Sequence, residues 1–199
     1  MNHELAERRS FLAWVTAGLG GLLTVFLGAP IAAYVADPRN RKGATSDFRI
    51  VDGLLLSDLK PNEPKQGVLR DIRHDAWTLH PNDVVGRVWV ILKKDPPPDP
   101  FPTGTDPGLL DVFTTICPHL GCPINLNQDQ ANNPGFTCPC HSAQYDRTGS
   151  RKAPANNPAP RDMDSLEWRI DVDPANPERK ALFVKYQSFR SSIPEKLVV

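Results

Sequence analysis

Two short segments contain all four cysteines of this 199-residue chain and two of its five histidines. Residues 117–122, here called the first box, read CPHLGC, and residues 138–141, the second box, read CPCH. Cysteine and histidine bind metals as thiolate and imidazole. Four cysteines scattered at random would not collect into two such boxes. We therefore expect a fold that brings the two boxes together at one site.

The spacing limits which metal group the boxes can bind. Two cysteines and two histidines can form a tetrahedral zinc set, usually spaced as Cys-x2-4-Cys with His-x3-5-His, and the boxes do not show that combination. Covalent haem attachment needs Cys-x-x-Cys-His, which is absent from the sequence. A zinc site and a purely structural set of disulfides are kept as alternatives for these residues.

The two boxes resemble those of the Rieske iron–sulfur family, in which a 2Fe–2S cluster takes two thiolates on one iron and two imidazoles on the other. The resemblance implies that Cys117 and Cys138 bind the buried iron. It also implies that His119 and His141 bind the outer iron and expose their free ring nitrogens to solvent or substrate. The predicted cofactor is a Rieske-type 2Fe–2S cluster.

The resemblance extends to residues around the ligands. Cys122 and Cys140 match the pair that forms a disulfide in the quinol-oxidising branch of the family, which implies an oxidising compartment. Tyr145 stands where the family has a tyrosine that hydrogen-bonds a cluster thiolate. Residues 157–160, NPAP, resemble the proline loop that covers the cluster, although glycine is its usual first residue and an ordinary surface loop has the same composition.

One departure from the family concerns the reduction potential. High-potential members commonly read Cys-Pro-Cys-His-Gly-Ser-x-Tyr, and the serine donates a hydrogen bond to a cluster sulfur. Here Ala143 occupies that position and Ser142 precedes it, so we predict a lowered potential, less so if Ser142 turns inward and contacts the cluster. A low potential favours menaquinol over ubiquinol as the electron donor.

The N-terminal region predicts a membrane anchor. Residues 11–36 contain no charged side chain and would form a helix about 39 Å long, enough to cross a bilayer with tilt. Residues 7–12, ERRSFL, resemble a twin-arginine export signal, which this family normally keeps as its anchor. A signal peptide cleaved near residues 29–33 is the alternative. Basic residues at 39, 41 and 42 favour the opposite orientation, but we give the export signal and the extra cysteines greater weight.

The rest of the chain predicts an all-β head. Six short runs have strand character, and one of them, 166–172, alternates apolar and charged residues. The 21 prolines fit antiparallel strands joined by loops, and 95–107 is expected to be a stiff surface insertion. The expected domains are a cytoplasmic N-terminus (1–10), an anchor (11–36), a flexible tether (37–47) and a Rieske head (48–199) with a cluster-binding subdomain at about 112–165. The six runs are 48–51, 68–72, 87–92, 109–116, 166–172 and 181–186.

The whole layout resembles the Rieske subunit of a respiratory cytochrome bc-type quinol–cytochrome c reductase. That resemblance implies an enzyme subunit that takes one electron from quinol and passes it to a c-type cytochrome haem, with a proton accepted at His119 or His141, the latter nominated for quinol contact. It implies a cytochrome b partner, a dimeric multi-subunit complex and a single-pass position in the bacterial inner membrane with a periplasmic or extracytoplasmic head. Because the formal net charge is zero, no nucleic-acid partner is expected.

Three other functions remain open at this point. The small Rieske subunit of an arsenite oxidase-type complex also combines a Rieske head with a twin-arginine signal. A soluble Rieske ferredoxin is a pure electron carrier, against which the apolar span and the extra cysteines argue. A zinc-stapled extracellular binding module would contain no iron.

Overall fold

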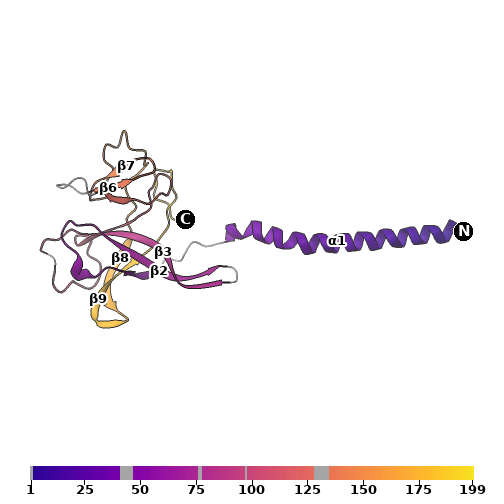
Figure 1. Cartoon of the computed structure of the whole chain (residues 1–199), viewed down its shortest axis with the longest axis horizontal. Coiled ribbons are helices and arrows are strands. Elements are labelled where there is room, and N and C mark those ends of the chain that lie inside the picture. Colours follow the sequence, from indigo (N-terminus) through magenta and orange to yellow (C-terminus); the bar gives the residue numbers. More distant parts are fainter. Residues whose placement is uncertain (1, 41–46, 76–77, 97, 128–134) are drawn as a thin grey trace. The chain divides into compact units, whose positions relative to one another are not determined.

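The computed structural model describes residues 2–40, 47–75, 78–96, 98–127 and 135–199. The chain divides into two units, Met1–Lys42 and Gly43–Val199. The first unit contains a single long helix, α1 (Asn2–Asn40), drawn in indigo to violet in Figure 1. Its segment Arg8–Val35 is the only helix in the described part of the chain that is long and apolar enough to cross a membrane.

The described side chains of α1 suit a lipid environment. All of them, residues 8–35, are exposed in the isolated chain. Within this segment Thr16 donates its hydroxyl to the carbonyl of Leu12 and Thr24 donates to that of Gly20, both at 2.8 Å. Each of these hydroxyls is therefore satisfied inside the helix, as an apolar solvent requires.

The helix extends beyond the anchor expected from the sequence. It includes residues 37–40, which were assigned to the flexible tether. The tether was expected there because residues 37–47 are polar, include Pro38 and show no apolar periodicity, but polar residues do not prevent a helix from continuing. The remaining tether residues at 41–46 lie outside the described part of the chain.

The second unit contains two antiparallel sheets and confirms the predicted all-β head. The large sheet has the order β4-β3-β2-β1-β9-β8, and the small sheet has the order β5-β6-β7. In Figure 1 the small sheet, labelled at β6 and β7, forms a group separate from the large sheet. Among the described residues the strands are β1 (Phe48–Asp52), β2 (Lys65–Asp75), β3 (Thr78–Leu92), β4 (Leu110–Thr114), β5 (Asn125–Asn127), β6 (Gly135–Cys138), β7 (Ala143–Tyr145), β8 (Glu167–Asp173) and β9 (Asn176–Lys185), and η1 (Leu56–Asp58) is a 3-10 turn.

Strand β3 contributes to two hydrophobic cores because successive side chains of a strand point to opposite faces. Val88 and Val90 belong to the first core, whose residues come mainly from the strands of the large sheet. Trp89 and Ile91 belong to the second core, which also contains buried residues of the small sheet. The unbroken buried run at the end of β3 therefore results from burial on both faces.

Trp89 connects β3 to the segment that leads into the small sheet. Its indole N–H donates to the carbonyl of Ile124 at 3.1 Å, and its ring lies 5.4 Å from that of Phe136 in β6. Trp89 is 8% exposed and Ile124 is 1% exposed, so this hydrogen bond is buried. A buried tryptophan needs such a partner for its N–H.

The proline-rich insertion packs against the chain's own edge strand. Gly104 and Ile170 of β8 exchange two backbone hydrogen bonds, at 2.8 and 2.9 Å. Thr105 donates to the carbonyl of Trp168 at 2.8 Å, and Phe101 packs against the first core. The insertion therefore covers an edge that would otherwise present unpaired backbone groups.

The sequence located the large sheet better than the small one. All six predicted runs overlap strands of the large sheet, although β2 and β3 are longer than predicted and β4 is shorter. The three strands of the small sheet were not predicted. Each has only three or four residues, too few to show a periodic pattern.

We predict that Trp89→Phe loosens the small sheet. The substitution removes the hydrogen bond to Ile124 and leaves a buried carbonyl without its partner, which costs about 1–3 kcal/mol. Hydrogen exchange should become faster across β5, β6 and β7. Trp168→Phe is the control, because Trp168 is similarly buried but belongs to the first core. Equal exchange in the small sheet of both variants would contradict this role of Trp89.

Candidate metal centre

The two boxes lie at the ends of strands that the second core supports. The first box follows β4 and is closed as a turn by two backbone hydrogen bonds. Cys117 donates to Cys122 at 2.8 Å and Gly121 donates to Cys117 at 2.9 Å. Gly121 has a φ of +78°, a conformation that favours glycine. The second box begins at Cys138, the last residue of β6, and connects β6 to β7.

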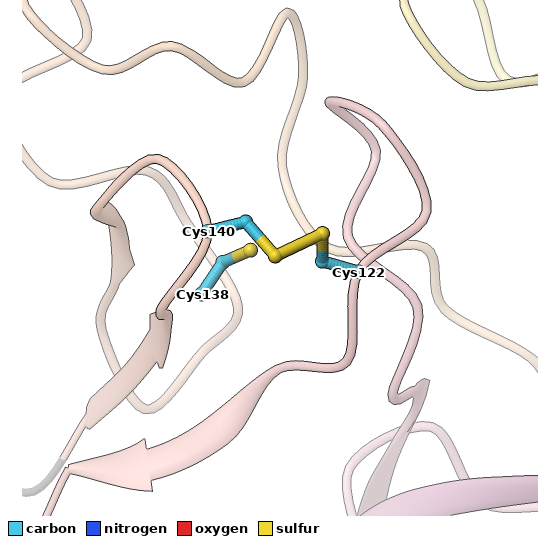
Figure 2. A group of neighbouring side chains, drawn as sticks. All are labelled: Cys122, Cys138 and Cys140. Carbon is cyan, nitrogen blue, oxygen red and sulfur yellow. A yellow bond between two sulfur atoms is a disulfide. The ribbon is translucent and has the colours of Figure 1, made fainter.

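A disulfide between Cys122 and Cys140 joins the two boxes, so the disulfide expected from the sequence is present. Figure 2 shows Cys138 beside this bond, and the three sulfur atoms lie within 4.8 Å of one another. Because Cys122 and Cys140 are bonded to each other, Cys138 is the one member of this trio whose thiolate can bind a metal.

The two cysteines outside the disulfide, Cys117 and Cys138, are free and fully buried in the second core. Burial raises the pKa of the Cys117 thiol, and the neighbouring Cys138 thiol raises it further. Hydrogen bonds from the Tyr145 hydroxyl and the His119 backbone lower this pKa and partly oppose the shift. In the metal-free protein the neutral thiol is therefore favoured, and metal binding must release its proton.

Tyr145 contacts one of these thiols from β7. Its hydroxyl oxygen lies 3.3 Å from the Cys117 sulfur, and the whole tyrosine is buried. Burial, as the largest cause, and the hydrogen bond with Cys117, as the second, raise the pKa of the Tyr145 hydroxyl far above its ordinary range. The hydroxyl therefore stays protonated and can donate to a thiolate at any physiological pH.

The two histidines of the boxes lie next to each other. Their ring centroids are 4.7 Å apart, and the rings are nearly perpendicular. His141 is exposed, while His119 is partly buried. The Nδ1 atom of His119 is buried and has no hydrogen-bond partner in the described part of the chain. A buried polar atom without a partner is costly, so this nitrogen needs a ligand that the protein itself does not supply.

The residues after the second box differ sharply in burial. Ser142 is exposed and has a φ of +58°, in the left-handed region. Ala143 is fully buried and pairs with Cys138 across β6 and β7. The exposed position of Ser142 does not favour the inward turn considered from the sequence, and a contact of its hydroxyl with the cluster stays a prediction.

Residues 157–160 pack beside the small sheet. The Asn157 amide donates to the carbonyl of Gln144 at 2.6 Å, and its oxygen accepts the Ala159 N–H at 3.0 Å. Ala159 belongs to the same core as Cys117 and Cys138. Asn157 therefore shapes this loop through its side chain, at the position where glycine is usual.

Three further residues around the first box were not predicted from the sequence. Arg161 and Asp164 form a buried ion pair, and Ser192 contacts the backbone of His119. They lie 42 to 73 positions from that histidine and belong to no spacing pattern, so no signal in a single sequence could have identified them.

Comparisons with known proteins agree with the chemistry of the boxes. The family model of the Rieske [2Fe-2S] domain matches residues 64–167. This match covers more than half of the chain and includes both boxes. It confirms the resemblance found in the sequence and the predicted cofactor, a Rieske-type 2Fe–2S cluster.

Similar proteins extend over most of the chain. A menaquinol:cytochrome c reductase iron-sulfur subunit from Geobacillus thermodenitrificans is 27% identical, over 85% of this chain and 89% of its own. A protein of the same name from Bacillus subtilis is 28% identical, over 74% and 77%. The cytochrome b6-f complex iron-sulfur subunit of Chlorobaculum thiosulfatiphilum is 25% identical, over 84% and 72%.

The residues at the site fit a 2Fe–2S group of this type. The two free thiols are buried and the two imidazoles lie adjacent and nearer the surface, which matches a cluster with one thiolate-bound and one imidazole-bound iron. The unpartnered Nδ1 of His119 is the observation that most specifically requires a ligand.

We predict that Tyr145→Phe lowers the midpoint potential of the site by roughly tens of millivolts. The hydroxyl stabilises the more negative reduced form, and a hydrogen bond to a charged group contributes about 1.5–3 kcal/mol, shared unequally between the redox states. Tyr186→Phe is the control, because Tyr186 is buried in the first core. A redox titration in which the two variants give the same potential would contradict the role of Tyr145.

Proposed function

Because the chain belongs to the Rieske [2Fe-2S] domain family, we propose that it is the iron–sulfur subunit of a respiratory cytochrome bc-type quinol–cytochrome c reductase. The observation that carries this proposal is the similarity, over most of both chains, to two iron–sulfur subunits of menaquinol:cytochrome c reductases. The subunit takes one electron from quinol and passes it to a c-type cytochrome haem.

In this proposal the four iron ligands form two pairs, one buried and one nearer the surface. Cys117 and Cys138 bind the inner iron from within the second core, and His119 and His141 bind the outer iron closer to solvent. When bound, the cluster supplies a one-electron carrier whose potential is raised by the imidazole ligands. The disulfide between Cys122 and Cys140 joins the two boxes covalently, so neither pair of ligands separates easily.

The proton of quinol is accepted at the exposed side of the site. His141 is exposed, and its ring is adjacent to that of His119. An imidazole can accept a proton near neutral pH and release it afterwards to solvent. We therefore assign quinol contact to His141, with His119 as the second candidate, so that the electron and the proton leave quinol together.

The first unit is proposed to be the membrane anchor of this subunit. Arg8–Val35 has the length and hydropathy of a span, and the disulfide supports a head in an oxidising compartment outside the cytoplasm. The partners are a cytochrome b subunit and a c-type cytochrome in a dimeric complex of the bacterial inner membrane.

Under this proposal, substitutions of the iron ligands and substitutions of the disulfide cysteines should have different effects on the cluster. Substituting Cys117, Cys138, His119 or His141 should abolish the cluster, because each change removes an iron ligand. Cys122→Ser and Cys140→Ser should retain a cluster that is lost more easily, because the iron ligands remain and only the bond between boxes is gone. Iron and labile sulfide are measured after purification. Complete loss in all six variants would refute this division.

Menaquinol is the proposed donor, and Ala143 is the residue that supports it. Ala143 is fully buried and pairs in register with Cys138, so a serine here would place its hydroxyl beside the inner ligands. Without that hydroxyl the reduced cluster has one hydrogen-bond donor fewer, which lowers the reduction potential. Two of the three relatives described above, both similar over most of the chain, carry menaquinol in their names.

We predict that Ala143→Ser raises the midpoint potential by roughly tens of millivolts, because it restores a hydrogen-bond donor beside Cys138. Ser142→Ala is the control, since the exposed Ser142 hydroxyl should not affect the potential. Both variants are titrated beside the unmodified protein. If the potential of Ala143→Ser does not move, the argument for menaquinol from this residue fails.

The proposed function is tested by purifying the untagged chain from its native membranes in mild detergent. We expect a cytochrome b and a c-type cytochrome to accompany it, and menaquinol to reduce the bound cytochrome c. Purification with a molybdenum-containing subunit and no cytochrome b would overturn the proposal in favour of an arsenite oxidase-type complex.

A further inference from the structure

Residues 187–199 follow β9 and form a closed turn that returns to the first box. Phe189 and Val198 form an antiparallel bridge. Arg190 donates to the carbonyl of Leu197 at 2.8 Å, and Val199 donates to that of Ser188 at 3.0 Å. These backbone bonds close the base of the turn and leave Ser192 near its tip.

Ser192 makes two hydrogen bonds to the first box. Its hydroxyl donates to the carbonyl of His119 at 2.6 Å, and its N–H donates to the carbonyl of Pro118 at 2.8 Å. Ser192 has a φ of +65°, which is uncommon for a residue other than glycine. Such a conformation persists where the surrounding contacts determine it. Ser192 thus donates a hydrogen bond to each of two successive backbone carbonyls, those of Pro118 and His119.

A buried ion pair connects this turn to the large sheet. The Arg161 guanidinium donates to both carboxylate oxygens of Asp164, at 2.9 and 2.8 Å, and to the carbonyl of Ile193 at 2.6 Å. The carbonyl of Asp164 accepts the N–H of Thr114 in β4 at 3.0 Å. The residue next to Ser192 is therefore fixed to the same strand that leads into the first box.

A second contact anchors the other side of the turn. The Lys196 ammonium donates to the carbonyl of Ser165 at 2.6 Å and lies 4.8 Å from the centre of the Phe189 ring. Phe189 packs against the first core. The turn is thus attached at two points, which leaves Ser192 with a fixed position from which to contact the box.

A small cavity lies between the turn and the first box. Its volume is about 50 Å³, and Cys117, Pro118, Asp164 and Ser191 are among the residues that line it. The box therefore has unfilled space beside it and is not held on this side by close packing. The hydrogen bonds of Ser192 connect the turn to the box beside this space and oppose a movement of the box away from the turn.

We propose that residues 187–199 position the first box and that Ser192 is the positioning residue for His119. This inference rests on the proposed function, in which His119 binds the outer iron. The imidazole of His119 has a buried Nδ1 without a partner in the described part of the chain, so no side-chain hydrogen bond at that atom orients the ring. Before the iron binds, the position of the ring depends on the backbone, and Ser192 fixes that backbone at the His119 carbonyl.

The test uses three variants of the full chain in detergent. Ser192→Ala removes the hydroxyl, and Ser191→Ala removes the neighbouring hydroxyl as a matched control. Ser192→Gly also lacks the hydroxyl but is unstrained at positive φ, so it stays informative if the alanine variant folds poorly. For each variant we measure hydrogen exchange of residues 117–122, the rate of iron loss to bathophenanthroline disulfonate, and the EPR spectrum of the reduced protein.

We expect Ser192→Ala and Ser192→Gly to accelerate exchange in the first box and iron loss by about two- to tenfold, the range for one lost hydrogen bond. Their EPR g values should shift because the histidine ligand is less well oriented, whereas Ser191→Ala should match the unmodified protein. If both Ser192 variants match Ser191→Ala in all three measurements, the positioning role is refuted. An unmodified protein without an iron–sulfur signal would instead refute the proposed function, and exchange would still test the contact.

Discussion

The burial of Cys117 and Cys138 in one small core is the constraint on which the rest of the head depends. Two thiols can be kept together in an apolar interior only if the strands that carry them are packed firmly. β3 makes this possible by facing both cores, and the Trp89 hydrogen bond to Ile124 attaches the small sheet to it. The disulfide then joins the two boxes at their outer side.

The same arrangement separates the two tasks of the site. The thiols lie inside with Tyr145, whose protonated hydroxyl can donate to sulfur, and this end determines how easily an electron is held. The imidazoles lie toward the surface, where His141 is exposed, and this end can meet a substrate and exchange a proton. A site with the thiols outside would be open to oxidation.

The sequence predicted the chemistry of the site far better than it predicted the strands and the turn that hold the site in place. The two boxes, the extra cysteines and Tyr145 lie within 29 positions and have fixed spacings, so their meaning could be read locally. The strands of the small sheet are too short for periodicity, and no sequence pattern connects Trp89 to Ile124, which lies 35 positions away. Ser192 could not be predicted at all, because its role depends on a turn that returns to a histidine 73 positions earlier.

The central claim is that a 2Fe–2S cluster is bound by both boxes through His119 and His141, and pulsed EPR tests it most directly. The reduced full-length protein would be prepared with 15N-labelled histidine and compared with the unlabelled protein. The account predicts strong couplings from two histidine nitrogens that change with the isotope. A protein that contains stoichiometric zinc, or a paramagnetic cluster without coordinated nitrogen, would contradict it.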